Sequence, residues 1–175
     1  MYKKTITVQV CDPEMLVYLN HGGPLIKTHV MDNLYLFEDE ENPSASPFYL
    51  HVAFEGGEII RWQGKSSNCD YQIELLDIRP VPGIKQNPLF ELQKDGKYIK
   101  RDKHGNLLMR SVSASQLPDN SSFQYRCYFN VIDSFSHAPV NSMPYFYDPY
   151  IILMKKKSFS GEKKNKDSEN HFSVA

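Results

Sequence analysis

A group of aromatic and charged side chains offers the residue types for a small binding site. Tyr147, Asp148 and Tyr150 lie within four residues of each other, and Arg61 stands beside the only tryptophan, Trp62. Phenol rings can stack on a sugar, and a guanidinium attracts an anion, so these residues could line a groove for a sugar or a small anionic ligand. The candidate ligand-binding residues are therefore Arg61, Tyr147, Asp148 and Tyr150.

The same residues also have structural interpretations. Neighbouring residues of a strand face opposite ways, so Trp62 could fill the core while Arg61 covers the sheet surface or pairs with an acid such as Glu74. Asp148 could cap backbone amides at a bulge around Pro149, a role that suits it better than that of a catalytic base. We expect a buried Trp62.

The spacing of histidine and cysteine favours neither a metal site nor a nucleophile. No two of the six histidines lie within five residues of each other, whereas zinc ligands are closely spaced or share one rigid face. The cysteines, Cys11, Cys69 and Cys127, form no Cys-x-x-Cys pair, and their odd number fits reduced thiols better than a disulfide framework. Cys127 falls on the inward face of a predicted strand, where an inert thiol is expected. We therefore expect no metal, no cofactor and no catalytic residues.

Composition and charge indicate a globular protein with no nucleic-acid or membrane partner. Hydrophobic residues make up 41% of the 175 residues, which is enough for a core. The last 21 residues carry a net charge of +3, which leaves −4 for residues 1–154, and an acidic body argues against nucleic-acid binding. The amino-terminal residues lack the continuous apolar region of a signal peptide, and no run is long enough for a transmembrane helix. These features predict a cytoplasmic protein.

Alternating apolar residues predict a series of short strands. The clearest case is residues 122–131, where Phe123, Tyr125, Cys127, Phe129 and Val131 alternate with polar residues. Residues 145–154 are apolar on both faces, which suits a strand covered on two sides, and Pro149 predicts a bulge or an edge position there. Further strands are predicted at residues 5–10, 30–37, 48–54, 58–63, 71–78 and 107–112.

Turn and cap signals separate these strands. Asp12-Pro13-Glu14 predicts the start of one short helix, which His21-Gly22-Gly23-Pro24 would end. Gly56-Gly57 predicts a tight hairpin between residues 48–54 and 58–63.

Further signals follow later in the chain. Asp95-Gly96 predicts a two-residue hairpin, and residues 102–106 predict a second, longer turn. The apolar phase shifts after Leu75 toward Leu76 and Ile78, which predicts a bulge or a strand that changes sheets. These patterns predict an all-β fold: an antiparallel, jelly-roll-like β-sandwich with one short N-terminal helix over residues 1–154. Residues 155–175, rich in lysine, predict a disordered tail.

Three motifs resemble the AidA/PixA family of bacterial inclusion body proteins. They are His29-x-Met-Asp-Asn-Leu-Tyr-Leu36, Gly57-Glu-Ile-Ile-Arg-Trp62 and Tyr147-Asp-Pro-Tyr-Ile151. The resemblance covers residues 1–154 and implies an abundant intracellular bacterial protein without catalytic motifs. Some members of the family form crystalline inclusions, and others accompany host-associated growth. The chain has only six methionines, which argues against a methionine storage role.

Three functions therefore compete, and the least favoured of them is an enzyme, because the sequence shows no set of nucleophile, base and orienting residue. The first is a non-enzymatic inclusion-type protein that self-associates, most simply as a dimer, through surplus aromatic residues of the segment 145–154. The second is a lectin-like sandwich that binds a sugar or a small anionic ligand.

Overall fold

The computed structural model describes residues 4–20, 34–38, 42–43, 49–53, 57–83, 89–112, 122–140 and 143–154. The fold is all-β with one short helix, as predicted. No helix in these ranges is long and apolar enough to cross a membrane. In chain order the elements are β1 (Lys4–Val10), α1 (Pro13–Asn20), β2 (Leu34–Glu38), β3 (Asn42–Pro43), β4 (Tyr49–Ala53), β5 (Ile59–Ser66), β6 (Tyr71–Pro80), β7 (Lys100–Arg101), β8 (Leu107–Arg110), β9 (Ser122–Asp133), β10 (Tyr145–Tyr147) and β11 (Tyr150–Met154).

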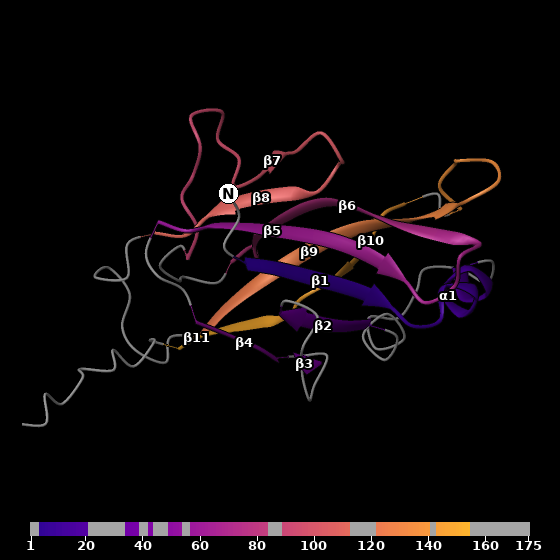
Figure 1. Ribbon diagram of the computed structural model, residues 1–175, viewed down its shortest axis with the longest axis horizontal. Helices are drawn as coiled ribbons and strands as arrows, with labels where there is room; N and C mark the ends of the chain where they lie inside the picture. Colours follow the sequence, from indigo (N-terminus) through magenta and orange to yellow (C-terminus); the bar gives the residue numbers. More distant parts are fainter. Residues whose placement is uncertain are drawn as a thin grey trace, which may run out of the picture.

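The strands form two sheets. One has six strands in the order β3-β2-β1-β5-β8-β7, and the other has the order β10-β9-β11-β4, with β6 also paired to β9. In Figure 1 the strand β9 runs behind β5 and β1. Buried side chains from both sheets form one core that extends from Ile6 in β1 to Ile151 in β11.

Two strand pairs are parallel, which the predicted antiparallel sandwich did not include. β1 runs parallel to β5, and β11 runs parallel to β4. The hairpin predicted at Gly56-Gly57 is wrong for a related reason. The strands before and after these glycines lie in different sheets, so the chain crosses between the sheets there. Gly57 does have the positive φ of 78° that the sequence predicted.

The break at Asp148-Pro149 contains no bulge. Tyr147 lies opposite Cys127, and Tyr150 lies opposite Gln124, so the register along β9 is the same on both sides of the break. Proline supplies no backbone donor, which is why β10 and β11 are separate strands, but its carbonyl oxygen still accepts a bond from the Tyr125 amide (3.1 Å). The predicted bulge after Leu75 is confirmed by a register shift between Leu75 and Asp77.

A row of three aromatic rings in edge-to-face contact joins the two sheets in the core. Trp62 of β5 is 1% exposed and makes a T-shaped contact with Phe90, whose ring makes a second one with Tyr125 of β9. The Tyr125 hydroxyl accepts a bond from the Leu89 amide (3.0 Å). The predicted burial of Trp62 is confirmed.

Local signals placed the helix and two turns correctly. The Asp12 carboxylate accepts a bond from the Met15 amide (2.9 Å), as expected of a residue that caps α1. Gly96 and Gly105 have positive φ in turns closed by backbone bonds, and the second turn joins β7 to β8. The first turn is present, but no strand flanks it within residues 91–99, so the hairpin predicted at Asp95-Gly96 is not formed by strands. The predicted helix stop at residues 21–24 and the predicted tail at 155–175 lie outside the described residues.

Candidate functional site

The four candidate ligand-binding residues do not share one open groove. Arg61 belongs to β5 of the six-stranded sheet, whereas Tyr147, Asp148 and Tyr150 belong to the other sheet or border its strands. Arg61 is half-buried on the face of β5 opposite to Trp62. Glu74, its suggested partner, lies in β6, where its carboxylate accepts a bond from Asn130 (3.4 Å). Ligand binding by these four residues stays a prediction.

Tyr147 faces the core. Its side chain is fully buried, and its hydroxyl has no hydrogen-bond partner in the part of the chain that the structure describes. Burial, with a smaller contribution from the neighbouring Cys127 thiol, raises the pKa of the phenol well above its ordinary value of 10.0. Tyr145 is also buried, and of the aromatic residues in β10 only Phe146 is exposed, at 38%. The expected surplus of exposed aromatic residues in this segment is therefore wrong.

Asp148 forms an ion pair with Arg126 across the strand pair. The common register places Asp148 opposite Arg126, and the guanidinium donates from Nε to Oδ1 (2.7 Å) and from Nη2 to Oδ2 (2.8 Å). The Asp148 side chain is 3% exposed and that of Arg126 is 23% exposed. The bonds to Asp148 raise the pKa of Arg126 further above its ordinary value. Because both carboxylate oxygens bind Arg126, Asp148 is a structural residue, not a free base.

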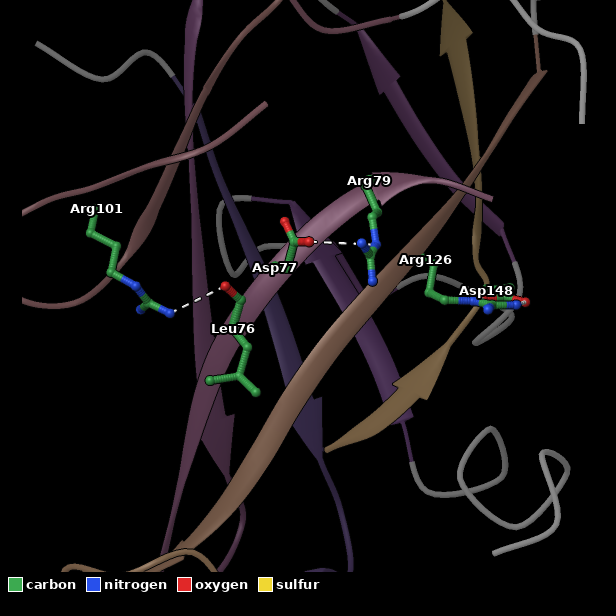
Figure 2. A network of polar contacts seen from close by, with 6 residues as sticks. All are labelled: Leu76, Asp77, Arg79, Arg101, Arg126 and Asp148. Carbon is green, nitrogen blue, oxygen red and sulfur yellow. Dashed lines mark hydrogen bonds and ion pairs between the residues drawn. The ribbon is translucent and has the colours of Figure 1, made fainter. Parts of the chain in front are cut away.

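This ion pair is part of a larger arrangement on the outer face of three adjacent strands. We call six residues the outer-face network: Asp77 and Arg79 on β6, Arg126 and Tyr128 on β9, Phe146 on β10, and Asp148 directly after β10. The Arg79 guanidinium lies 4.5 Å from the centre of the Tyr128 ring, and that of Arg126 lies 4.4 Å from the centre of the Phe146 ring. Figure 2 shows the two arginines with their carboxylates. Each cation thus has both a carboxylate and an aromatic face.

A second arginine contact closes the side of the sandwich at the β6 bulge. Arg101 of β7 donates from Nη2 to the carbonyl oxygens of Leu75 (2.8 Å) and Leu76 (3.2 Å), and from Nη1 to that of Gly105 (2.9 Å). Figure 2 shows the contact with Leu76. A bulge disrupts the ladder locally, and Arg101 supplies donors to the carbonyls there. It also joins the edge strands of the two sheets.

Segments that carry exposed apolar side chains lie at one end of the sandwich. Here Met15 and Tyr18 of α1 are 47% and 77% exposed, Phe135 in the turn after β9 is 85% exposed, and Met143 before β10 is 76% exposed. We call these four residues the α1 end. In Figure 1 the helix and the turn after β9 both lie at the right of the sandwich.

Hydrogen bonds hold the parts of the α1 end together. Asn68, between β5 and β6, donates to the Glu14 carboxylate of α1 (2.9 Å), and the Ser134 hydroxyl donates to the Cys69 carbonyl oxygen (2.9 Å). The Tyr145 hydroxyl donates to the carbonyl oxygen of Leu16 in α1 (3.2 Å). These contacts hold α1 and two turns together at one end of the sandwich. The periodicity of the sequence did not predict this end, because the pattern of a short helix and a turn does not show which apolar residues remain exposed.

The thiols and acids of the described residues form no reactive cluster. Cys127 is buried, and its burial raises the pKa of its thiol well above the ordinary value of 9.0. Cys11 is partly buried, with its thiol pKa raised for the same reason, and Cys69 is exposed. Within the ranges that the structure describes, no three histidine, cysteine or acidic side chains are grouped so that they could hold a metal ion.

Comparison with known proteins finds similarity in structure only. No family model matches the sequence, and no curated protein matches it. Among solved structures, the fold is similar to that of the inclusion body protein PixA from Burkholderia cenocepacia. The TM-score is 0.55 at 9% sequence identity, and the match covers 86% of this chain and 94% of that one. At this identity the similarity establishes a shared fold.

Proposed function

We propose that this protein is a non-enzymatic, inclusion-body-type protein that assembles with copies of itself inside the cell. The observation that carries the proposal is the fold shared with a protein described as an inclusion body protein over most of both chains. The chemistry of the described residues agrees with this function. The Asp148 carboxylate is bound by Arg126, and the Cys127 and Tyr147 side chains are buried away from any substrate.

The α1 end is the surface that we assign to assembly. Its four large apolar side chains are between 47% and 85% exposed and come from segments that hydrogen bonds join. Grouped exposed apolar residues on a soluble protein commonly mark an interface. The formal net charge of −1 supplies little repulsion between copies. A second copy of the chain, packed through the same surface, is the simplest occupant because two-fold interfaces are self-complementary. A link to host-associated growth stays a prediction.

Sedimentation velocity tests this function directly. The full chain is run near neutral pH over a wide range of concentrations. We expect the weight-average mass to rise from one chain toward two or more as the concentration increases. A mass that stays at one chain up to the highest concentration would contradict assembly and favour a ligand-binding function for the same fold.

A further inference from the structure

A polar cleft of about 440 Å³ lies where the β7–β8 turn meets β6 and the turn after β9. This volume falls within the range of small-molecule sites, about 300–1,000 Å³. The residues with polar side chains that line it come from four segments distant in the sequence, and they are Trp62, Gln63, Gln72, Glu74, Arg101, His104, Asn106 and His137. None of them is one of the four residues of the α1 end, although His137 lies in the same turn as Phe135.

Trp62 is one of the residues that line this cleft, and its indole carries an unsatisfied donor. The side chain is 1% exposed, and its Nε1 has no hydrogen-bond acceptor among the described residues. The T-shaped contact with Phe90, at 6.4 Å between ring centres, packs the indole but offers it no lone pair. Leaving a buried donor without an acceptor is energetically costly. A ligand that brings an acceptor to Nε1 would recover part of that free energy.

Two turns, each organised by an aspartate, bring histidines to the same cleft. The Asp102 carboxylate accepts bonds from the amides of His104 (2.8 Å) and Asn106 (3.0 Å). The Asp133 carboxylate accepts bonds from the amides of Phe135 (3.0 Å) and Ser136 (2.7 Å).

These bonds make both turns rigid at neutral pH. A bond from the Asn106 side chain is the main cause of a lowered pKa at Asp102, and bonds from Ser136 are the main cause at Asp133, so both carboxylates stay ionised. His137 has a φ of 53°, a left-handed conformation that the rest of its turn holds in place. The imidazoles of His104 and His137 are thus presented from fixed backbone positions.

The chemistry of the lining favours a neutral ligand with several hydroxyl groups. Arg101 also borders the cleft, but its guanidinium is bound to three backbone carbonyl oxygens. The other polar groups of the lining are one acid, Glu74, and amide and imidazole groups, which can both donate and accept hydrogen bonds, as a hydroxyl does. The amide of Gln63 donates to the Thr7 hydroxyl (2.9 Å), and its oxygen can still accept a bond. Ile73 and Leu75 supply an apolar part of the lining.

We propose that this cleft binds a neutral monosaccharide, one oxygen of which accepts a hydrogen bond from the indole of Trp62. The indole is almost fully covered, so binding includes a small opening of the cleft wall. The exposed side chains of His104 and His137 can move aside to permit it. The inference does not depend on self-association.

Nuclear magnetic resonance of the full chain tests the site, because one tryptophan gives one indole N–H resonance. The protein is titrated with glucose, galactose, mannose and N-acetylglucosamine, and separately with glucuronate and inorganic phosphate. We expect a saturable downfield shift of the Trp62 resonance with at least one of the neutral sugars. No saturable shift with any neutral sugar would overturn the proposal, and a shift with the two anions alone would also overturn it.

Two matched glutamine variants locate the ligand. Gln72→Ala removes an exposed amide from the cleft, and Gln93→Ala removes a half-buried amide from a turn that borders a different cavity. We expect the dissociation constant of the sugar to rise at least about tenfold in Gln72→Ala and to stay unchanged in Gln93→Ala. Equal effects of the two substitutions would overturn the placement in the cleft. Thermal unfolding of each variant checks that both fold.

Discussion

The outer-face network and the α1 end differ in how many of their side chains have partners within the chain. In the network, Arg126 has Asp148 and the Phe146 ring, and Arg79 has Asp77 and the Tyr128 ring. At the α1 end, the side chains of Tyr18 and Phe135 are 77% and 85% exposed. The difference suggests that the network stabilises the fold of one chain, whereas the α1 end is available to a second chain. Substitutions in the two regions should therefore affect different quantities.

The largest effect on stability is expected from the ion pair of the network. Asp148→Ala leaves the Arg126 guanidinium half-buried without its carboxylate, which should lower the free energy of unfolding by about 3 kcal/mol. Asp77→Ala is the matched control, because Asp77 and Arg79 are 36% and 50% exposed and 3.5 Å apart, and its cost should stay below about 1 kcal/mol. Urea unfolding measures both. Equal costs would show that burial of the Asp148 pair does not matter.

A smaller loss of stability is expected at the edge where the sheets meet. Arg101→Ala removes the donors to Leu75, Leu76 and Gly105, and we expect a loss of about 2 kcal/mol. Lys100→Ala changes the neighbouring exposed residue of the same strand and should stay within about 0.5 kcal/mol of the wild type. The idea that Arg101 joins the sheets fails if both variants unfold at the same urea concentration.

The attachment of α1 should make stability depend on pH in the alkaline range. Burial raises the pKa of Tyr145 from 10.0 to about 12, and its protonated hydroxyl donates to Leu16. Because the folded pKa is the higher one, the contribution is complete below pH 10 and is lost as the pH rises toward about 12. Burial also raises the pKa values of Tyr125 and Tyr147, so these two residues add to the loss of stability above pH 10, and a variant of Tyr145 is needed to isolate its part.

The control for this effect is Tyr145→Phe, which has no hydroxyl to ionise. The stability of this variant should fall less steeply than that of the wild type over the same alkaline range. Chemical unfolding at a series of pH values gives the two slopes. Identical slopes would mean that Tyr145 does not link α1 to the sheet through its hydroxyl.

Local sequence signals predicted individual elements well. The cap at Asp12, the burial of Trp62 and the bulge after Leu75 each follow from residues within a few positions of one another. The connection at Gly56-Gly57 could not be predicted in this way, because a glycine pair permits a tight turn without determining which sheet receives the next strand.

The side-chain partners were harder to predict than the strands. Asp148 meets Arg126 only through the register of β9 with β10 and β11, which no local pattern contains. Residues 145–154 are apolar on both faces, so alternation could not show that Tyr147 is buried while Phe146 is exposed. Arg101 binds carbonyl oxygens of a bulge some 25 residues earlier in the chain.

The most direct test of the central claim is the self-association of variants at the α1 end. Tyr18→Ser and Phe135→Ser change side chains that are 77% and 85% exposed, and Leu92→Ser changes one that is 59% exposed outside that end. In sedimentation velocity, we predict that the double variant Tyr18→Ser, Phe135→Ser associates at least about tenfold more weakly than the wild type, a difference of about 1.4 kcal/mol. Leu92→Ser should associate as the wild type does, and all should melt at similar temperatures. Wild-type association of the double variant, or its loss in Leu92→Ser alone, would contradict assembly through the α1 end.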